Sequence, residues 1–196
     1  MKFDYMQKLG SGCFGIVYPL EAGKVIKFGK IEADREFFEL HAAKAGVSLF
    51  PAYYGTKDDV IYEERVKGQI NTEVGTGIVV QQLKQTFSQA VGEGRIPFKV
   101  LEDKLYELEE KLFRFSVETG IILDDLHGGN LMFDEHDNLY VSDVGIWFEV
   151  AQDKDDEYIR TVVAECISAW CDLDGCNYGN SEFLDEQNAF QSRFSL

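Results

Sequence analysis

The sequence predicts an α+β chain of two lobes, a small antiparallel-sheet lobe in residues 1–68 and a reduced, mainly helical lobe in residues 69–196. Three observations predict it. Short apolar runs separated by glycine turns open the chain, as strands do. Apolar residues then recur at every third or fourth position in residues 98–115, as in an amphipathic helix. Two further apolar runs enclose a polar turn at residues 124–130, where we expect the functional site.

Composition excludes several classes of protein. A hydrophobic content of 45% with 13% aromatic residues excludes global disorder. The chain lacks an opening basic-then-apolar segment and any apolar run near the roughly 20 residues that span a bilayer. Four cysteines are too few and too unevenly placed for a disulfide scaffold. We therefore expect a cytoplasmic protein with no membrane partner, in a bacterial or phage-infected cell. The sequence does not indicate which oligomeric state the protein adopts.

Charge divides unevenly along the chain. Residues 1–100 contain 12 acidic and 13 basic side chains, whereas residues 101–196 contain 23 acidic and 6 basic ones. The second half should repel nucleic acid and attract basic partners or metal cations. A solvated acidic surface without a partner explains the same charge equally well.

Residues 6–28 predict strand, glycine loop, strand, turn and strand. Gly10, Gly12 and Gly15 leave backbone amides open to phosphates. In the last strand Val25 and Lys27 share a face, so an apolar wall and an ammonium group lie together. A mere turn is the alternative for the glycine loop taken alone.

The remaining elements follow in order. Residues 32–45 predict a helix that ends at Gly46, with Glu36 and Glu39 on one face, from which either could reach Lys27; a solvated face is the alternative. Residues 60–68 predict a strand that leaves the first lobe near Gly68. We expect helices over residues 78–91, from residue 98 to about 120, and over residues 158–170. Residues 172–196 have no assigned role.

The polar turn has the chemistry of a phosphoryl-transfer site. Gly128 and Gly129 can adopt backbone conformations closed to other residues, so a tight turn could aim Asp125 and Asn130 at one point. Asp143 follows the next apolar run. A carboxylate that accepts a hydroxyl proton, an amide oxygen and a carboxylate that binds magnesium are what phosphoryl transfer needs.

Together these motifs resemble the protein kinase-like fold over residues 5–150. Residues 10–17 match its glycine-rich loop, and Val25-Ile26-Lys27 matches its third strand. The resemblance implies that Lys27 holds the first two phosphates of ATP and pairs with Glu36, with Glu39 as the fallback. It also implies that the backbone at Glu64 in the hinge binds adenine. The implied nucleotide-binding residues are Gly10, Ser11, Gly12, Gly15, Val17, Val25, Lys27, Glu36 and Glu64.

The same resemblance implies catalytic roles. Asp125 and Asn130 have the spacing of the kinase catalytic loop, and Asp143-Val144-Gly145 corresponds to the metal-binding element. Asp125 is implied to take the acceptor proton, and Asn130 and Asp143 to ligate Mg²⁺. His127 is implied to brace the loop more than to transfer protons.

Departures from the pattern concern the substrate. Asp124 stands where an arginine precedes the catalytic aspartate in ordinary eukaryotic kinases, so control by a phosphorylated activation loop is not expected. Residues 125–130 are similar to the catalytic loop of aminoglycoside-type small-molecule kinases and of short phage serine/threonine kinases. No Ala-Pro-Glu segment follows Asp143.

Three functions remain open. The first is a compact ATP- and Mg²⁺-dependent serine/threonine kinase that acts on a protein hydroxyl, with the acidic second half favouring basic targets. The second is a small-molecule kinase of the aminoglycoside or choline type. The third is a pseudokinase-like acidic binding module.

Overall fold

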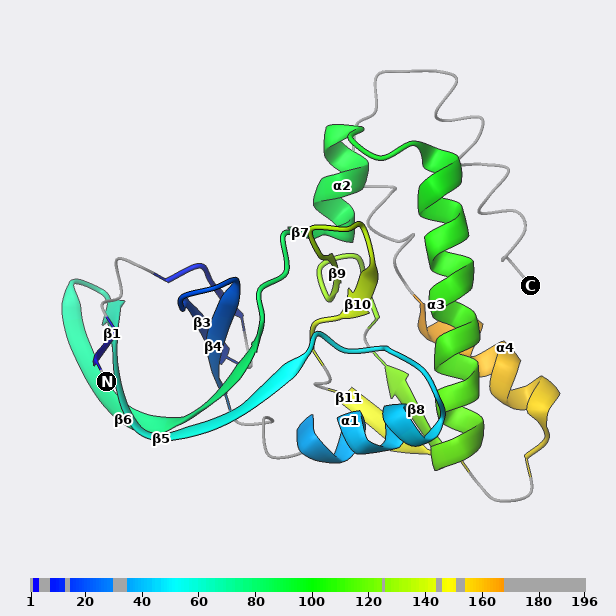
Figure 1. The fold of residues 1–196 in the computed structure, drawn as a ribbon, viewed down its shortest axis with the longest axis horizontal. Helices are drawn as coiled ribbons and strands as arrows, with labels where there is room; N and C mark the ends of the chain where they lie inside the picture. The colour runs from blue at the N-terminus through cyan, green and yellow to red at the C-terminus, as the bar shows by residue number, and fades with distance from the viewer. Residues whose placement is uncertain are drawn as a thin grey trace. The chain divides into compact units, whose positions relative to one another are not determined.

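The computed structural model describes residues 2–3, 8–12, 15–29, 35–124, 126–143, 146–150 and 154–167. The chain divides into two compact units. Unit 1 comprises Met1–Leu40 and Pro51–Gln82, and unit 2 comprises His41–Phe50 and Leu83–Leu196. The predicted α+β class with two lobes is confirmed, since strands dominate unit 1 and the long helices belong to unit 2 (Figure 1).

Unit 1 is built on one six-stranded sheet. Its strand order is β1-β5-β6-β4-β3-β2, and every neighbouring pair is antiparallel except β1 with β5. The strands are β1 (Lys2–Phe3), β2 (Gly10–Gly12), β3 (Gly15–Pro19), β4 (Lys24–Gly29), β5 (Tyr53–Val66) and β6 (Gln69–Gln81). The predicted series of strands and turns in residues 6–28 therefore forms β2, β3 and β4.

The two faces of this sheet have different apolar clusters. Ile26 and Phe28 of β4 belong to a buried cluster on one face. Val25 belongs to a second cluster with residues of β6. Gly77 of β6 allows close packing, because a Cβ there would lie 2.7 Å from Ile26 Cγ1. The alternation expected in β4 is thus present, and Lys27 shares a face with Val25.

The boundary predicted at Gly68 is wrong. Gly68 lies in the turn of the long hairpin between β5 and β6, which Figure 1 shows as a curved ribbon, and unit 1 extends to Gln82. The helix predicted over residues 78–91 is wrong in its first part, because Ile78 and its neighbours pair with β4. A short apolar run that is buried on both faces cannot be told from a buried helix by periodicity.

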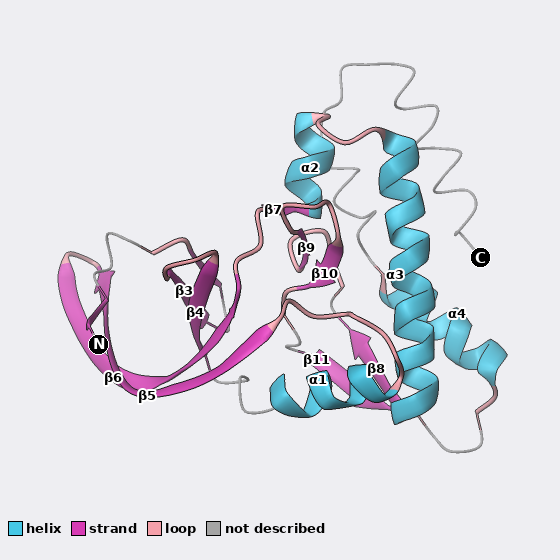
Figure 2. Cartoon of the chain, viewed as in Figure 1, coloured by secondary structure: helices cyan, strands magenta, loops and turns pink. Residues whose placement is uncertain are grey.

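Unit 2 combines helices with two small sheets (Figure 2). One sheet has the order β10-β9-β7 and the other pairs β11 with β8, all antiparallel. The elements are β7 (Gln85–Thr86), α2 (Phe87–Glu93), α3 (Phe98–Thr119), β8 (Ile121–Asp124), β9 (Leu131–Phe133), β10 (Leu139–Val141), β11 (Ile146–Glu149) and α4 (Asp156–Cys166). Helix α1 (Arg35–Lys44) spans the division between the units.

Helix α3 is the predicted amphipathic helix. It buries one apolar stripe and ends at Gly120, whose left-handed φ of 70° lets its N–H bond to Ser116 O at 2.8 Å. The buried apolar residues of α3 are Leu101, Leu105, Leu108, Leu112 and Phe115. No described helix is both long and apolar enough to cross a membrane.

Helix α4 packs against α3 and β8. The Asp155 side chain caps its start by accepting from Tyr158 N at 2.9 Å, and Ile159 and Val163 are buried. These two residues belong to the predicted stripe, although α4 begins two residues before the predicted helix. Arg160 joins α4 to α3, since its guanidinium lies 3.0 Å from Glu110 Oε2.

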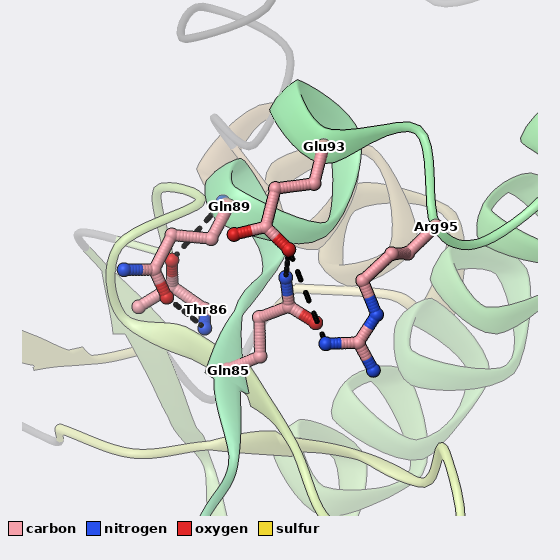
Figure 3. A network of polar contacts seen from close by, with 5 residues as sticks. All are labelled: Gln85, Thr86, Gln89, Glu93 and Arg95. Carbon is pink, nitrogen blue, oxygen red and sulfur yellow. Dashed lines mark hydrogen bonds and ion pairs between the residues drawn. The ribbon is translucent and has the colours of Figure 1, made fainter.

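Side chains around the start of α2 form a polar network (Figure 3). Thr86 Oγ1 accepts from Gln89 N and Gln89 Oε1 accepts from Thr86 N, both at 3.1 Å, which completes a capping box. Buried Gln85 donates through Nε2 to Glu93 Oε2 at 2.9 Å, and Arg95 lies 3.9 Å from the same oxygen. These contacts join β7 to α2.

Candidate active site

A closed turn connects β8 to β9. The carbonyl oxygen of His127 accepts from Asn130 N at 2.9 Å and from Leu131 N at 3.2 Å. Ser88 of α2 donates its N–H to Gly128 O at 3.0 Å, so α2 anchors this turn. Asp125, the predicted base, lies outside the described residues, and its role stays a prediction.

The His127 ring explains why residue 129 is glycine. His127 Nδ1 accepts a hydrogen bond from Gly129 N at 3.0 Å. A Cβ on Gly129 would lie 2.8 Å from His127 Cε1, and the φ of Gly129 is not left-handed. The expected special backbone conformation is therefore not the reason at this position. The reason is instead the space that the His127 ring occupies. His127 also contacts the loop backbone, as the resemblance implies.

Asn130 and Asp143 lie at the same end of a β-hairpin. Leu131 of β9 pairs with Val141 of β10, so Asn130 and Ser142 come next to each other beyond that pair. Ser142 donates to Asn130 O both from its backbone N, at 2.8 Å, and from Oγ, at 2.9 Å. These bonds place the backbone of Asn130 beside Ser142, the residue before Asp143, and the magnesium-binding role of the two residues stays a prediction.

Asp134 holds the other end of the same hairpin, and sequence reasoning missed it. Its buried carboxylate accepts from His136 N at 2.8 Å, Asn138 N at 2.9 Å and Asn138 Nδ2 at 3.0 Å. Burial raises the pKa of Asp134. The hydrogen bonds from Asn138 and His136 lower this pKa by more than burial raises it, so the pKa lies below its usual value. The signal in the sequence is the polar stretch of residues 134–138 between two apolar runs.

Lys27 lies among apolar side chains in unit 1. Across the strands, Lys27 pairs with Val17 on one side and Ile78 on the other, and Val25 pairs with Val80. The predicted glycine loop is the hairpin of β2 and β3, with Gly10 opposite Val17 and Gly12 opposite Gly15. Residues 13–14 at its turn lie outside the described residues. The predicted glycines, Ser11, Val17, Val25 and Lys27 thus belong to three adjacent strands.

Comparison with known proteins agrees with this architecture. No protein-family model matches the chain. No curated protein matches its sequence either. The structure is similar to the ROP18 kinase domain in complex with AMP-PNP and sucrose, with a TM-score of 0.51 and 15% sequence identity. The chain has a protein kinase-like fold. The match covers 84% of this chain and 62% of that one, so less than two thirds of the ROP18 chain has a counterpart here.

Within this kinase-like fold, the hinge assignment of Glu64 is wrong. Glu64 pairs with Asn71 near the tip of the β5–β6 hairpin, so it does not lie where the chain leaves unit 1. Gln82 does. Its N–H bonds to Gly23 O at 2.9 Å, and Lys84 N bonds to Phe133 O at 2.7 Å. The change from apolar residues 78–80 to polar residues 81–82 was the signal for this connection.

The two glutamates predicted to pair with Lys27 both belong to α1. Glu36 lies in the first turn of α1, and its side chain is outside the described part of the structure. Its pairing with Lys27 stays a prediction. Glu39, the fallback, is half-buried in the same helix.

The end of β8, just before the turn to β9, is also tied to α4. The Cys166 thiol on α4 donates to the carboxylate of Asp124, the residue before Asp125. Burial, and then the negative charge of Asp124, raise the pKa of Cys166 to about 12. No local pattern in the sequence pairs these two residues.

The predicted magnesium ligands have suitable chemistry. Mg²⁺ prefers oxygen ligands and keeps several waters, so one carboxylate and one amide oxygen suffice on the protein side. Asp143 and Asn130 supply these and are both half-buried. Among the described residues, which leave out Asp125, no three His, Cys, Asp or Glu side chains gather as a metal site.

Proposed function

We propose that the chain is an ATP- and Mg²⁺-dependent phosphotransferase that acts on a serine or threonine hydroxyl of a protein. The observation that supports the proposal is the double hydrogen bond from Ser142 to Asn130 O, which joins the backbone at the end of residues 125–130 to the residue before Asp143. The AMP-PNP bound to the similar ROP18 kinase domain supports a nucleotide substrate.

The roles follow from the chemistry of each side chain. Lys27 neutralises phosphate charge, and Val17 and Val25 cover the adenine. When bound, Mg²⁺ supplies neutralisation of the charge on the transferred phosphoryl group. Asp125 takes the proton of the acceptor hydroxyl, whose oxygen forms a bond to the γ-phosphorus as the bond to the leaving ADP oxygen breaks.

Two features bear on the acceptor. The net charge of residues 101–196 favours a basic protein. The similarity of residues 125–130 to the loop of small-molecule kinases favours a small hydroxylated acceptor as the second candidate.

The first experiment measures thermal stability with ATP. We expect ATP to raise the melting temperature of the protein only when Mg²⁺ is present, because a ligand of the native state at about 100 times its Kd stabilises by about 2.7 kcal/mol. Asp143→Asn should abolish this rise. Asp103→Asn, at an exposed carboxylate of α3, is the matched control and should retain it. A wild-type protein without a Mg²⁺-dependent rise contradicts the proposal.

The second experiment separates binding from chemistry. With labelled ATP, transfer to proteins of a cell lysate is compared with transfer to small hydroxylated metabolites. Asp125→Ala should keep nucleotide binding and lose transfer. Undiminished transfer in that variant contradicts the assignment of the base.

A further inference from the structure

A hollow of about 720 Å³ opens on the sheet of unit 1. This is the size of the pockets that hold small molecules in other proteins. Its described lining residues come from β3 and the turn after it, from β4, and from β5 and β6. All of them belong to unit 1, so the hollow is a feature of one unit by itself.

The hollow lies on the face of the sheet opposite to Lys27. Ile26 of β4 pairs with Val79 of β6, and Val79 lines the hollow. Side chains alternate along a strand, so Lys24 shares the face of Ile26, whereas Val25 and Lys27 belong to the other face. The hollow is therefore separate from the nucleotide-binding residues that the kinase resemblance implies.

A glycine in β5 keeps the hollow open. Gly55 pairs with Val79, so a side chain at residue 55 would stand on the same face as Val79. A Cβ on Gly55 would meet no atom within 4 Å, so this space is open. The floor of the hollow is apolar, because Val79 belongs to a buried cluster against which Leu20 packs. An apolar ligand can lose water-exposed surface by covering this floor.

Two lysines place positive charge at the hollow. Lys24 Nζ lies 4.2 Å from the centre of the Tyr54 ring, and both side chains belong to the lining. Lys57 of β5 also lines the hollow and is exposed. Neither lysine forms an ion pair with a carboxylate of the described residues. Glu21 is the one acidic residue in the described lining, so two lysines and one glutamate leave a net charge of +1.

The turn that leads to Lys24 is held in place by backbone hydrogen bonds. Leu20 N donates to Lys24 O at 2.8 Å, and Gln82 N donates to Gly23 O at 2.9 Å. A site whose backbone is already fixed loses less conformational freedom when a ligand binds. The side of the hollow formed by this turn is thus organised before any ligand is present.

We propose that this hollow binds a small molecule that has one anionic group, a carboxylate or a phosphate, on an aromatic body. The anionic group contacts the ammonium groups of Lys24 and Lys57. The aromatic body covers the floor at Leu20 and Val79 and packs against the Tyr54 ring. This binding goes beyond the proposed function and does not depend on it, because it uses none of the residues implied to hold ATP.

Calorimetric titration of the full chain tests the site with three probes. 2-Naphthoate and 2-naphthyl phosphate have the two anionic groups on the same aromatic body, and 2-naphthamide is the neutral counterpart. We expect at least one anion to bind about tenfold more tightly than the amide. The tighter anion identifies which group the hollow takes. Equal Kd values for all three probes overturn the proposal.

Lysine variants test the source of the charge. The double variant Lys24→Gln and Lys57→Gln should weaken binding of the tighter anion about tenfold and leave binding of 2-naphthamide unchanged. Lys154→Gln is the matched control, because Lys154 Nζ also lies over a tyrosine ring, 4.7 Å from the centre of Tyr158, but outside the lining. It should change the Kd less than about twofold. Unchanged anion binding in the double variant, with an intact melting curve, overturns the proposal.

NMR of ¹⁵N-labelled protein locates the bound probe. The amide signals of Gly55, Lys57 and Val79 should shift when the tighter anion is added. Shifts confined to Lys27 and its neighbours on the other face would place the probe among the implied nucleotide-binding residues and overturn the proposal. Probe binding at Gly55 without a Mg²⁺-dependent effect of ATP would keep this site and remove the proposed function. An effect of ATP without probe binding would remove this site alone.

Discussion

Ser142 makes two hydrogen bonds to one atom, the carbonyl oxygen of Asn130, through its backbone N and its Oγ. Removing the hydroxyl in Ser142→Ala should lower the free energy of unfolding by about 1 kcal/mol. If Asn130 ligates magnesium, the affinity of the Ser142→Ala protein for Mg²⁺ with ATP should also fall about tenfold, as it does when residues that support metal ligands are replaced. Urea unfolding and calorimetric titration measure the two effects.

Ser142→Thr is the control for this change, because it keeps the hydroxyl group. It should retain most of the Mg²⁺-dependent affinity. If Ser142→Ala lowers stability but leaves that affinity unchanged, Ser142 supports only the hairpin and not the metal ligands.

Gly129→Ala should destabilise the protein by about 1–3 kcal/mol, because its Cβ would lie 2.8 Å from His127 Cε1. The cause can be isolated by a double-mutant cycle with His127→Ala, which removes the ring. In that background Gly129→Ala should cost much less free energy of unfolding. Equal costs in both backgrounds, measured by urea unfolding, would exclude the ring as the cause.

Asp134 should make stability depend on acid pH. Its pKa is lowered in the folded protein, so its ionised form contributes stability above the usual pKa, and this contribution is lost as pH falls through the lowered folded-state pKa. The difference in unfolding free energy between wild type and Asp134→Asn should therefore shrink from pH 6 towards about pH 2. Denaturant unfolding at several pH values measures it. A difference that is constant with pH contradicts the role of the charge.

Cys166 should react slowly with alkylating reagents. The thiolate is the reactive form, and a pKa of about 12 keeps the thiol protonated near neutral pH. Mass spectrometry after iodoacetamide treatment at pH 8 should show Cys166 modified far more slowly than a cysteine in a short peptide. Asp124→Asn removes the charge that raises the pKa, so modification should become faster. An unchanged rate in that variant would exclude the charge of Asp124 as a cause.

Some elements could be predicted because their cause is local. The apolar stripe of α3 and its end at Gly120 follow from side chains three and four residues apart and from one glycine. The alternation that places Val25 and Lys27 on one face of β4 is equally local. The residue types at 130 and 143 predict a metal-binding pair, and this stays a prediction.

Other features depend on contacts between distant residues. The strand nature of residues 78–81 comes from pairing with β4 in the sheet, and that pairing moved the boundary from Gly68 to Gln82. The reason for Gly129 is the position of a neighbouring ring and not its own backbone conformation.

The sequence by itself therefore determined the class of fold, the order of its local elements and the residue types of the candidate site. Only the tertiary structure decided the partners: the Ser142 hydrogen bonds to Asn130, the Cys166 thiol against Asp124, and the pairing of β11 with β8. Periodicity and turn residues act within a few positions of the chain. Strand register and side-chain contacts are selected by packing between segments far apart in the sequence, which no local pattern records.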